Sequence, residues 1–257
     1  EIDKALQILC RHKKNNPIFV GEAGVGKTAI VQGIAQRIVN GNVPAKLKDS
    51  VIFSLDIFAI LAGAKYRGEF EERLKEIINY LKENKNHIIF IDEIHTILNT
   101  GNNDNGQDAA NILKPHLANG DIRCIGATTY SEFRNFNKDK ALLRRFNKID
   151  VDEPSKEESL EILKGLKATY EKFHNVKYSD EILSQSIEMA KRYLSDKFLP
   201  DSAIDIIDEA GAATNIEHKK SVTKSKINEI VAKMANISNI QTSSDNTQIL
   251  KNLSHTL

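Results

Sequence analysis

A glycine-rich loop between a short apolar run and a predicted helix constrains this chain more than any other feature. The loop follows Pro17–Val20 and consists of Gly21, Glu22, Ala23, Gly24, Val25, Gly26, Lys27 and Thr28. Glycine lets backbone amides approach a polyphosphate closely, and a helix from Lys27 to about Asn40 would point its positive dipole end at the anion. Lys27 would lie beside the β- and γ-phosphates, and Thr28 would offer a hydroxyl to Mg²⁺. We therefore predict binding of a nucleoside triphosphate with Mg²⁺.

Apolar strands alternate with amphipathic helices up to about residue 152. The expected strands are Ile18–Val20, Val51–Leu55, Ile88–Ile91, Cys124–Ala127 and Ile149–Val151. Near-continuous apolar strands separated by helices indicate a mostly parallel sheet with helices on both faces. Residues 1–152 are therefore predicted to form an α/β nucleotide-binding subdomain. The first residue falls inside a helical pattern, so we expect the chain to be part of a longer protein.

The pattern becomes almost entirely helical after Glu153. Ser155 can cap a helix, with Glu158 three residues further on completing a capping box. The expected helices are about Ser155–Phe173, Ser179–Leu194, Asp201–Glu217 and Lys224–Ala235. We predict a small helical subdomain over residues 153–237. Residues 238–257 are rich in Ser, Thr, Asn and Gln, which is typical of a linker.

Composition argues against nucleic-acid and membrane partners. The 36 Lys and Arg residues and 35 Asp and Glu residues leave a formal charge of +1, which gives no basic footprint for nucleic acid or an acidic membrane. We expect neither a membrane span nor a signal peptide. Cys10 falls in a predicted helix and Cys124 in a predicted strand, and both are expected to be buried, reduced thiols. These features predict a soluble, cytoplasmic protein.

Two carboxylates end the third expected strand, in the segment Ile88–His95. Asp92 would lie at the carboxyl end of the strand beside the phosphate loop, where it can hold Mg²⁺ directly or through water. Glu93 is placed to polarise a water for attack on the γ-phosphorus. The alternative is that two acids merely terminate a strand, but the phosphate loop upstream favours the catalytic interpretation. His95 is expected to have a structural role.

The fourth expected strand ends in Thr128 and Thr129. Either hydroxyl could hydrogen-bond the γ-phosphate or the attacking water. This signal is weak by itself, because threonine often ends a strand.

An arginine pair, Arg144 and Arg145, precedes the last strand. Such pairs usually bridge acids on their own surface. The alternative is that they reach the γ-phosphate of another subunit, as arginine fingers do.

The order of these motifs resembles that of the AAA+ ATPases, and more closely the first nucleotide-binding (D1) module of the Clp/Hsp100 unfoldases. The resemblance includes Gly63–Glu71, Leu113–Pro115 and Leu199–Asp205. It implies an ATPase with a phosphate-loop large subdomain and a helical lid. The roles it implies are the Walker A pair Lys27 and Thr28, the Walker B pair Asp92 and Glu93, sensor 1 at Thr128 or Thr129, the fingers Arg144 and Arg145, and nucleotide binding by Pro200 and Asp201.

The same resemblance implies a pore loop at Lys65, Tyr66 and Arg67. An aromatic side chain on a mobile loop between Gly63 and Gly68 can pack against any polypeptide, so it would grip substrates without selecting sequences. The alternative is a tyrosine that covers the core. A second loop, residues 100–106, carries no aromatic residue and is expected to have a secondary role.

Within the family, the resemblance favours the ClpA branch. ClpB and ClpC relatives carry a coiled-coil insertion after the small-domain helix, whereas this sequence passes from Glu217 through Lys220 directly to its last helix. The implied function is a homo-hexameric ring that uses ATP and Mg²⁺ to unfold polypeptides and thread them to the ClpP protease. ClpP and adaptors would bind through parts absent from this sequence. A sensor-2 arginine is not evident, because Ala213–Asn215 stands at its place.

Two other functions stay open at this stage. The module could bind ATP chiefly to hold a ring together, with little hydrolysis, or it could belong to a ClpC- or ClpB-type chaperone. An AAA+ motor acting on nucleic acid is disfavoured by the near-neutral charge and by the tyrosine of the expected pore loop.

Overall fold

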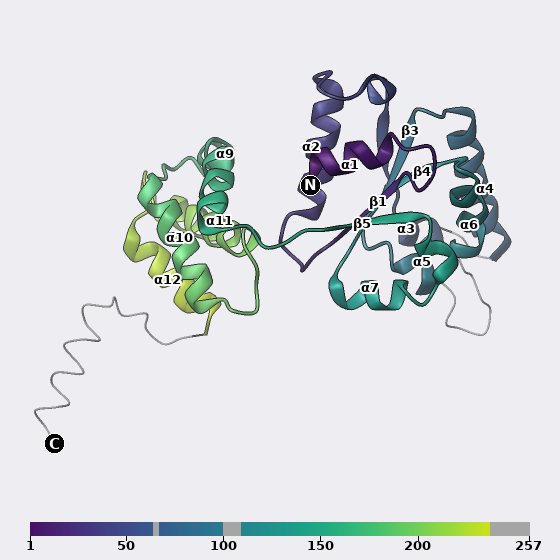
Figure 1. Ribbon diagram of the computed structural model, residues 1–257. Coiled ribbons are helices and arrows are strands. Elements are labelled where there is room, and N and C mark those ends of the chain that lie inside the picture. The colour runs from purple at the N-terminus through teal and green to yellow at the C-terminus, as the bar shows by residue number, and fades with distance from the viewer. Residues whose placement is uncertain (64–66, 100–108, 237–257) are drawn as a thin grey trace, which may run out of the picture. The chain divides into compact units, whose positions relative to one another are not determined.

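The computed structural model describes residues 1–63, 67–99 and 109–236 (Figure 1). The chain divides into two compact units, Glu1–Asp152 and Glu153–Leu257. The first unit is built on a sheet covered by helices. The described part of the second unit contains helices α9 to α12. The segment expected to be a linker, residues 238–257, lies outside the described residues.

The first unit contains a five-stranded sheet in which all neighbouring strands are parallel. Its strands are β1 (Asn16–Val20), β2 (Val51–Ser54), β3 (His87–Ile91), β4 (Arg123–Thr128) and β5 (Phe146–Asp150). Their spatial order is β2-β3-β4-β1-β5. The predicted parallel α/β fold is therefore confirmed. The register sets Val20 beside Thr128, so the carboxyl ends of β1 and β4 meet at one edge of the sheet.

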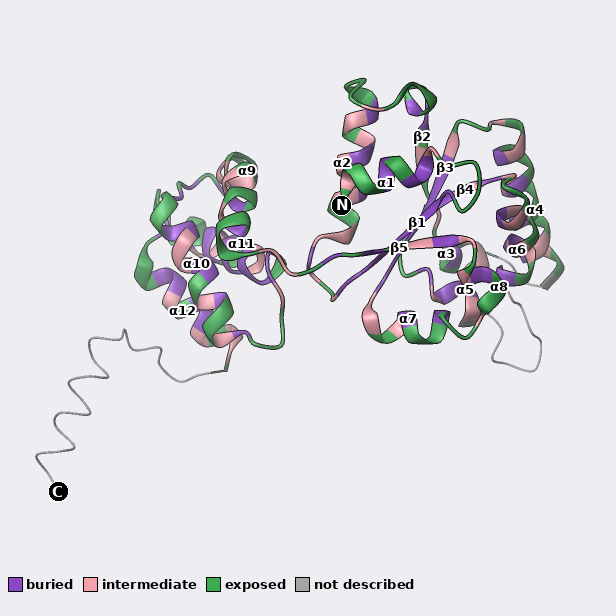
Figure 2. Cartoon of the chain, in the orientation of Figure 1, coloured by how far each residue is buried: buried purple, intermediate pink, exposed green. Residues whose placement is uncertain are grey.

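Burial explains why the apolar strands occupy the middle of the sheet. Every residue of β1 is buried, and Figure 2 shows the central strands in the colour of buried residues. β2 lies at the edge, and its Phe53 is 41% exposed. A strand with helices on both faces needs apolar residues in succession, whereas an edge strand with one open side does not. The phosphate loop therefore follows a strand whose residues are all buried.

Helices cover the sheet on both sides, with α1 and α2 on one side and α4 and α6 on the other (Figure 1). On the side of α4 and α6, Ile18 and Ile89 from the strands pack in one apolar cluster with Phe70, Leu74 and Leu113. The helices of this unit are α1 (Ile2–Leu9), α2 (Lys27–Val39), α3 (Ile57–Ala62), α4 (Arg67–Glu83), α5 (Thr96–Asn99), α6 (Ala109–Asn119), α7 (Tyr130–Phe136) and α8 (Lys140–Leu143), with a short 3-10 helix η1 (Ala45–Leu47).

The second unit packs four described helices, α9 (Lys156–His174), α10 (Asp180–Tyr193), α11 (Asp201–Ile216) and α12 (Lys224–Met234), around an apolar core. The predicted capping box at the start of α9 is confirmed. The Glu158 amide donates to Ser155 Oγ at 3.1 Å, and the Ser155 amide donates to Glu158 Oε2 at 2.8 Å. Two amides that would lack helical partners are thereby satisfied, which fixes where the helical unit begins.

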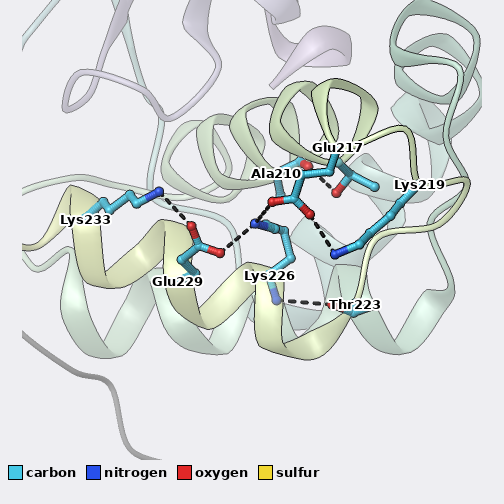
Figure 3. Close-up of polar contacts among 8 residues, drawn as sticks. Ala210, Glu217, Lys219, Thr223, Lys226, Glu229 and Lys233 are labelled. Atoms are coloured by element: carbon cyan, nitrogen blue, oxygen red, sulfur yellow. Dashed lines mark hydrogen bonds and ion pairs between the residues drawn. The ribbon is translucent and has the colours of Figure 1, made fainter.

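Charged side chains tie the end of α11 to α12 (Figure 3). The Lys226 ammonium donates to Glu217 Oε1 at 2.5 Å and to Glu229 Oε2 at 2.6 Å. Lys219 donates to the other oxygen of Glu217 at 2.7 Å, and Lys233 donates to the other oxygen of Glu229 at 2.7 Å. Hydrogen bonds from Lys219 and Lys226 lower the pKa of Glu217 to about 2. These ion pairs link the end of α11 to α12 across the short connection between the two helices.

The two cysteines differ in their surroundings. Cys124 is fully buried in β4, and burial raises the pKa of its thiol above the ordinary value. Cys10 follows the last residue of α1 and is only half-buried, so the prediction of a second buried thiol is wrong. The reason is that α1 ends one residue earlier and the chain continues into exposed residues 11–14. Both thiols are free.

No helix in the described ranges is both long enough and apolar enough to cross a bilayer.

Candidate nucleotide-binding site

The phosphate loop leaves β1 at a point where only glycine fits. The Gly21 amide donates to the Thr128 carbonyl at 3.2 Å. A Cβ on Gly21 would lie 2.2 Å from the Val151 carbonyl oxygen, which is backbone and cannot move aside cheaply. Gly26 has a φ of 98°, which side chains rarely adopt. The glycines expected from the sequence are therefore required by the fold of the loop.

The first turn of α2 is open to an anion. Gly26 is the N-cap residue, and among the described residues no side chain caps this helix. The Ile30 amide donates to the Gly26 carbonyl, so the amides of Lys27 to Ala29 precede the first bond of the helical ladder. Uncapped amides at the positive end of a helix dipole are the groups that phosphate oxygens accept from.

Lys27 extends its ammonium over the loop. Its Nζ donates to the carbonyls of Gly21 at 2.9 Å and Glu22 at 2.7 Å. Burial lowers the pKa of Lys27 below its ordinary value, although the charges of Asp92, Glu22 and Glu93 act in the opposite direction. A partly desolvated cation gains from a nearby anion, so this lysine is suited to phosphate binding.

Thr28 and Asp92 meet where the phosphate loop faces the end of β3. The Thr28 hydroxyl donates to Asp92 Oδ2 at 2.8 Å, across 64 residues of sequence. A hydroxyl and a carboxylate oxygen are ligands that Mg²⁺ prefers, so these two residues fit the ion. Within the described residues, no group of three or more His, Cys, Asp or Glu side chains could hold a metal alone. Phosphate oxygens and water would have to complete the coordination.

Glu93 follows in a backbone conformation that is unusual for a residue with a side chain. Its φ is 47°, in the left-handed region. The turn is held by the Ile94 amide, which donates to the Ala127 carbonyl at 2.9 Å, and by the Thr96 amide, which donates to the Glu93 carbonyl at 2.8 Å. Strained backbone of this kind persists where the surrounding structure holds it and is concentrated at functional sites. The exposed Glu93 side chain is thus presented from a fixed turn.

The two threonines at the end of β4 differ. Thr128 is 2% exposed, and its Oγ1 lies 3.1 Å from Nδ1 of His95. Thr129 is the N-cap of α7, where its hydroxyl accepts from the Glu132 amide at 3.3 Å and contacts Ser131 Oγ at 2.9 Å. Both hydroxyls are therefore engaged within the chain, and Thr129, which is only partly buried, is the more accessible of the two.

The two arginines after α8 also differ. Arg144 is exposed, whereas Arg145 is half-buried and donates from Nη1 to the Ala118 carbonyl at 3.4 Å in its own chain. Asp139 is the N-cap of α8 and accepts from the Ala141 and Leu142 amides, which holds the helix that ends just before the two arginines.

Other predicted site residues belong to the second unit or lie outside the described ranges. Lys65 and Tyr66 of the expected pore loop and residues 100–106 of the second loop lie outside the described residues. Of Arg67, only the backbone is described, as the first residue of α4. Pro200 is buried and Asp201 is exposed at the start of α11, in the second unit. A nucleotide contact by Pro200 or Asp201 stays a prediction.

Comparison with known families agrees with this geometry. Residues 17–152 match the family model of the ATPases associated with various cellular activities (AAA), which is more than half of the chain. The chain belongs to the AAA ATPase family. Residues 155–256 match the AAA lid domain. Membership of the AAA family implies nucleotide binding, and the site described above is the part of the module that would provide it.

Curated relatives of this AAA module come from several Clp proteins. A ClpA homolog protein of Fuscovulum blasticum is 48% identical over 263 aligned positions, covering 100% of this chain and 33% of the relative. Chaperone protein ClpB 1 of Nostoc sp. is 54% identical, covering 84% of this chain and 25% of the relative. The ATP-binding subunit ClpC of Staphylococcus epidermidis is 47% identical, and the alignment covers 98% of this chain and 31% of the relative. The module thus spans about a third or less of the length of these relatives.

Solved structures place the module in the Clp/Hsp100 group. A closed state of Hsp104 with ATPγS and FITC casein has a TM-score of 0.87 and 42% identity, covering 98% of this chain and 45% of that chain. An Hsp104–ADP complex of S. cerevisiae has a TM-score of 0.86 and 42% identity, and the match covers 96% of this chain and 43% of that chain. The fold is therefore that of a Clp/Hsp100 AAA+ module.

One set of contacts was not predicted from the sequence. His95 was expected to have a structural role, and its particular partners were not predicted: its Nδ1 lies 3.1 Å from Thr128 Oγ1, and its Nε2 lies 3.9 Å from the Glu132 carboxylate. In the sequence, only the position of His95 shortly after Asp92 and Glu93 could have indicated these contacts. Only the pairing of β3 with β4 shows which residue of β4 it meets.

Proposed function

We propose that this module binds ATP with Mg²⁺ and hydrolyses it to ADP and phosphate. The observation that carries the proposal is the contact between Thr28 and Asp92 at 2.8 Å, with Glu93 next in the chain on a held turn. The phosphate loop, a candidate metal-ligand pair and a candidate base thereby share one edge of the sheet. Binding alone would need only the loop, so the position of Glu93 argues for hydrolysis.

In this proposal, some residues of the site bind the phosphates and others activate the attacking water. The amides of the loop and the Lys27 ammonium would hold the β- and γ-phosphates, while Glu93 accepts a proton from the attacking water. The water oxygen bonds to the γ-phosphorus as the bond to the β-phosphate oxygen breaks, which leaves ADP and phosphate. Mg²⁺, held by Thr28 and Asp92, would neutralise charge on the phosphate oxygens.

Arg144 is the residue that we propose acts on a neighbouring subunit. It is exposed, whereas Arg145 already donates to Ala118 within its own chain. An arginine supplied in trans stabilises charge in the transition state and typically raises the rate by about 10³–10⁵-fold. The module would therefore act as a homo-oligomer, and the resemblance to Clp/Hsp100 proteins suggests a hexameric ring.

Unfolded polypeptide is the proposed substrate of the ring. Solved Hsp104 complexes with casein support this proposal by similarity, and Tyr66 with its neighbours Lys65 and Arg67 would form the gripping loop. The connection from α11 to α12 consists only of residues 217–223. It has no room for a coiled coil, which favours a ClpA-type partner of the ClpP protease over a ClpB or ClpC type. The relatives include all three types, and the cytoplasmic location stays a prediction.

Phosphate release measured over a wide range of protein concentration, with molecular mass in parallel, tests the proposal. We expect turnover per chain to rise as oligomers form, because Arg144 then reaches a neighbour's nucleotide. Arg144→Ala should remove most of this rise, whereas Arg134→Ala, which changes an exposed arginine on α7, should not. ATP binding with oligomers but without phosphate release at any concentration would contradict hydrolysis and indicate a module that serves assembly.

A further inference from the structure

The amide side chain of Asn16 connects the first residue of β1 to the turn that carries the arginine pair. Asn16 is 1% exposed. Its Nδ2 donates to the Arg145 carbonyl at 3.1 Å, and its Oδ1 accepts from the Cys124 amide at 2.8 Å. These bonds span 129 and 108 residues of sequence, so neither belongs to a local turn. One buried side chain thereby joins β1, β4 and the residue that precedes β5.

Only a side chain with both a donor and an acceptor satisfies these two partners. The Cys124 amide can only donate, and the Arg145 carbonyl can only accept. Asparagine carries an acceptor and a donor on one planar group, whereas a carboxylate only accepts and an aliphatic side chain does neither. The two backbone partners therefore explain why a buried asparagine stands at the start of an apolar strand.

The turn around Arg144 is held on both sides. Before it, the Arg144 amide donates to the Lys140 carbonyl at 3.3 Å and the Arg145 amide donates to the Leu142 carbonyl at 2.9 Å, which ties the turn to α8. After it, the Arg145 carbonyl accepts from Asn16. Arg144 itself is exposed. Its side chain thus extends from backbone that α8 holds upstream and Asn16 holds downstream.

The length of β1 separates this turn from the phosphate loop of the same chain. Asn16 is the first residue of β1 and pairs with Phe146, whereas the loop follows Val20 at the other end. At about 3.3 Å per residue, the two ends of the strand lie about 13 Å apart. The turn of Arg144 is therefore attached to the end of β1 that is remote from its own loop, which agrees with an action on a neighbouring subunit.

We propose that Asn16 is a positioning residue for Arg144: its amide holds the turn at Arg145 in the place from which Arg144 reaches the nucleotide of a neighbouring subunit. This inference rests on the proposed ATP hydrolysis and on the proposed action of Arg144, and it adds the residue that sets the position of that arginine. Asn16 touches no nucleotide in this role. Its loss should therefore leave ATP binding by its own chain intact and lower turnover by the assembled chains.

Asn16→Asp tests this role in the full chain with little change in shape. Its carboxylate keeps an acceptor for the Cys124 amide but has no proton to donate to the Arg145 carbonyl. In phosphate release at concentrations where oligomers form, we expect kcat to fall about 10–100-fold while KM for ATP changes less than twofold. Asn147→Asp is the matched control and should stay within about twofold, because Asn147 also donates to a backbone carbonyl, that of Lys14, but lies on β5 beyond the turn.

A double-mutant cycle shows whether Asn16 acts through Arg144. We expect the Asn16→Asp/Arg144→Ala chain to turn over no more slowly than Arg144→Ala alone, because the arginine whose position Asn16 sets is already gone. Losses that multiply would mean that Asn16 acts by another route and would overturn the proposal.

Mixing Asn16→Asp with Glu93→Gln distinguishes positioning of Arg144 from damage to β1. The Asn16→Asp chain keeps its own phosphate loop and Glu93, and the Glu93→Gln chain presents Arg144 normally. An equal mixture that exchanges subunits should recover about a quarter of unaltered turnover, because one site in four combines the two. If Asn16→Asp instead distorted the phosphate loop that follows β1, the mixture would recover nothing, and the proposal would be wrong. Asn16→Ser, which is neutral but too short to reach both partners, gives the same comparison if the buried carboxylate prevents folding.

A reference mixture of Arg144→Ala with Glu93→Gln separates this inference from the proposed function. Recovery in the reference mixture without recovery in the mixture that contains Asn16→Asp would overturn only the role of Asn16. Recovery in neither mixture, with turnover by the unaltered chain, would contradict the action of Arg144 between subunits and this inference with it.

Discussion

Glu93→Gln is expected to lower ATP turnover by about 10²–10⁴-fold while ATP still binds. Glutamine has nearly the same shape as glutamate but cannot take a proton from water. The groups that would hold the phosphates, the loop amides and Lys27, are unchanged by this substitution. We expect the dissociation constant for ATP to change less than threefold. Parallel measurement of phosphate release and of nucleotide binding checks both halves of this prediction.

Two further variants show whether the loss of turnover is specific to the side chain of Glu93. Glu83→Gln changes the same chemical group at the end of α4 and should leave turnover unchanged. Lys27→Ala should instead weaken ATP binding itself, because its ammonium lies over the phosphate loop. Turnover by Glu93→Gln within twofold of the unaltered chain would contradict the role assigned to Glu93.

Gly211→Ala is expected to destabilise the helical unit by about 2–4 kcal/mol. A Cβ at this position of α11 would lie 1.9 Å from the Tyr178 hydroxyl oxygen and 2.7 Å from His174 Cδ2. The tyrosine cannot move aside cheaply, because it is 2% exposed and donates to the Ile207 carbonyl at 2.8 Å. His174 is held on its other side by Asp208, 2.6 Å away. Thermal melting with hydrogen exchange of α10 and α11 measures the loss.

The melting temperature of the unit should fall by at least about 10 °C in Gly211→Ala. Gly165→Ala is the matched control, because nothing lies within 4 Å of its added Cβ, and alanine in the middle of α9 stabilises a helix by up to about 1 kcal/mol. Tyr178→Phe combined with Gly211→Ala removes the clashing hydroxyl and should recover part of the loss. A melting temperature unchanged by Gly211→Ala would show that the helices repack freely.

The parts of the site that were predicted from the sequence are local in the chain. The phosphate loop, the helix after it and the capping box of α9 depend on residues within a few positions of one another. Asp92 and Glu93 were also predicted at the carboxyl end of a strand, because parallel strands bring such ends to one edge of a sheet. The contact between Thr28 and Asp92 follows from that rule, although they are 64 residues apart.

The parts that the sequence left open depend on contacts between segments that are far apart in the chain. Thr128 and Thr129 were equivalent in the sequence, and only the structure shows one hydroxyl against His95 and the other capping α7. Arg144 and Arg145 were likewise equivalent until the contact with Ala118, 27 residues away, distinguished them. A one-residue change in register would exchange the roles of such neighbours, and no local pattern determines it.

Mixing two inactive variants tests the central claim most directly. Glu93→Gln keeps Arg144 but lacks the base, whereas Arg144→Ala keeps the base but lacks the arginine. If Glu93 and a neighbour's Arg144 act on one nucleotide, an equal mixture that exchanges subunits should recover about a quarter of unaltered turnover, because a random neighbour pair supplies both groups at one site in four. A mixture no more active than the sum of its components would contradict a shared site between subunits.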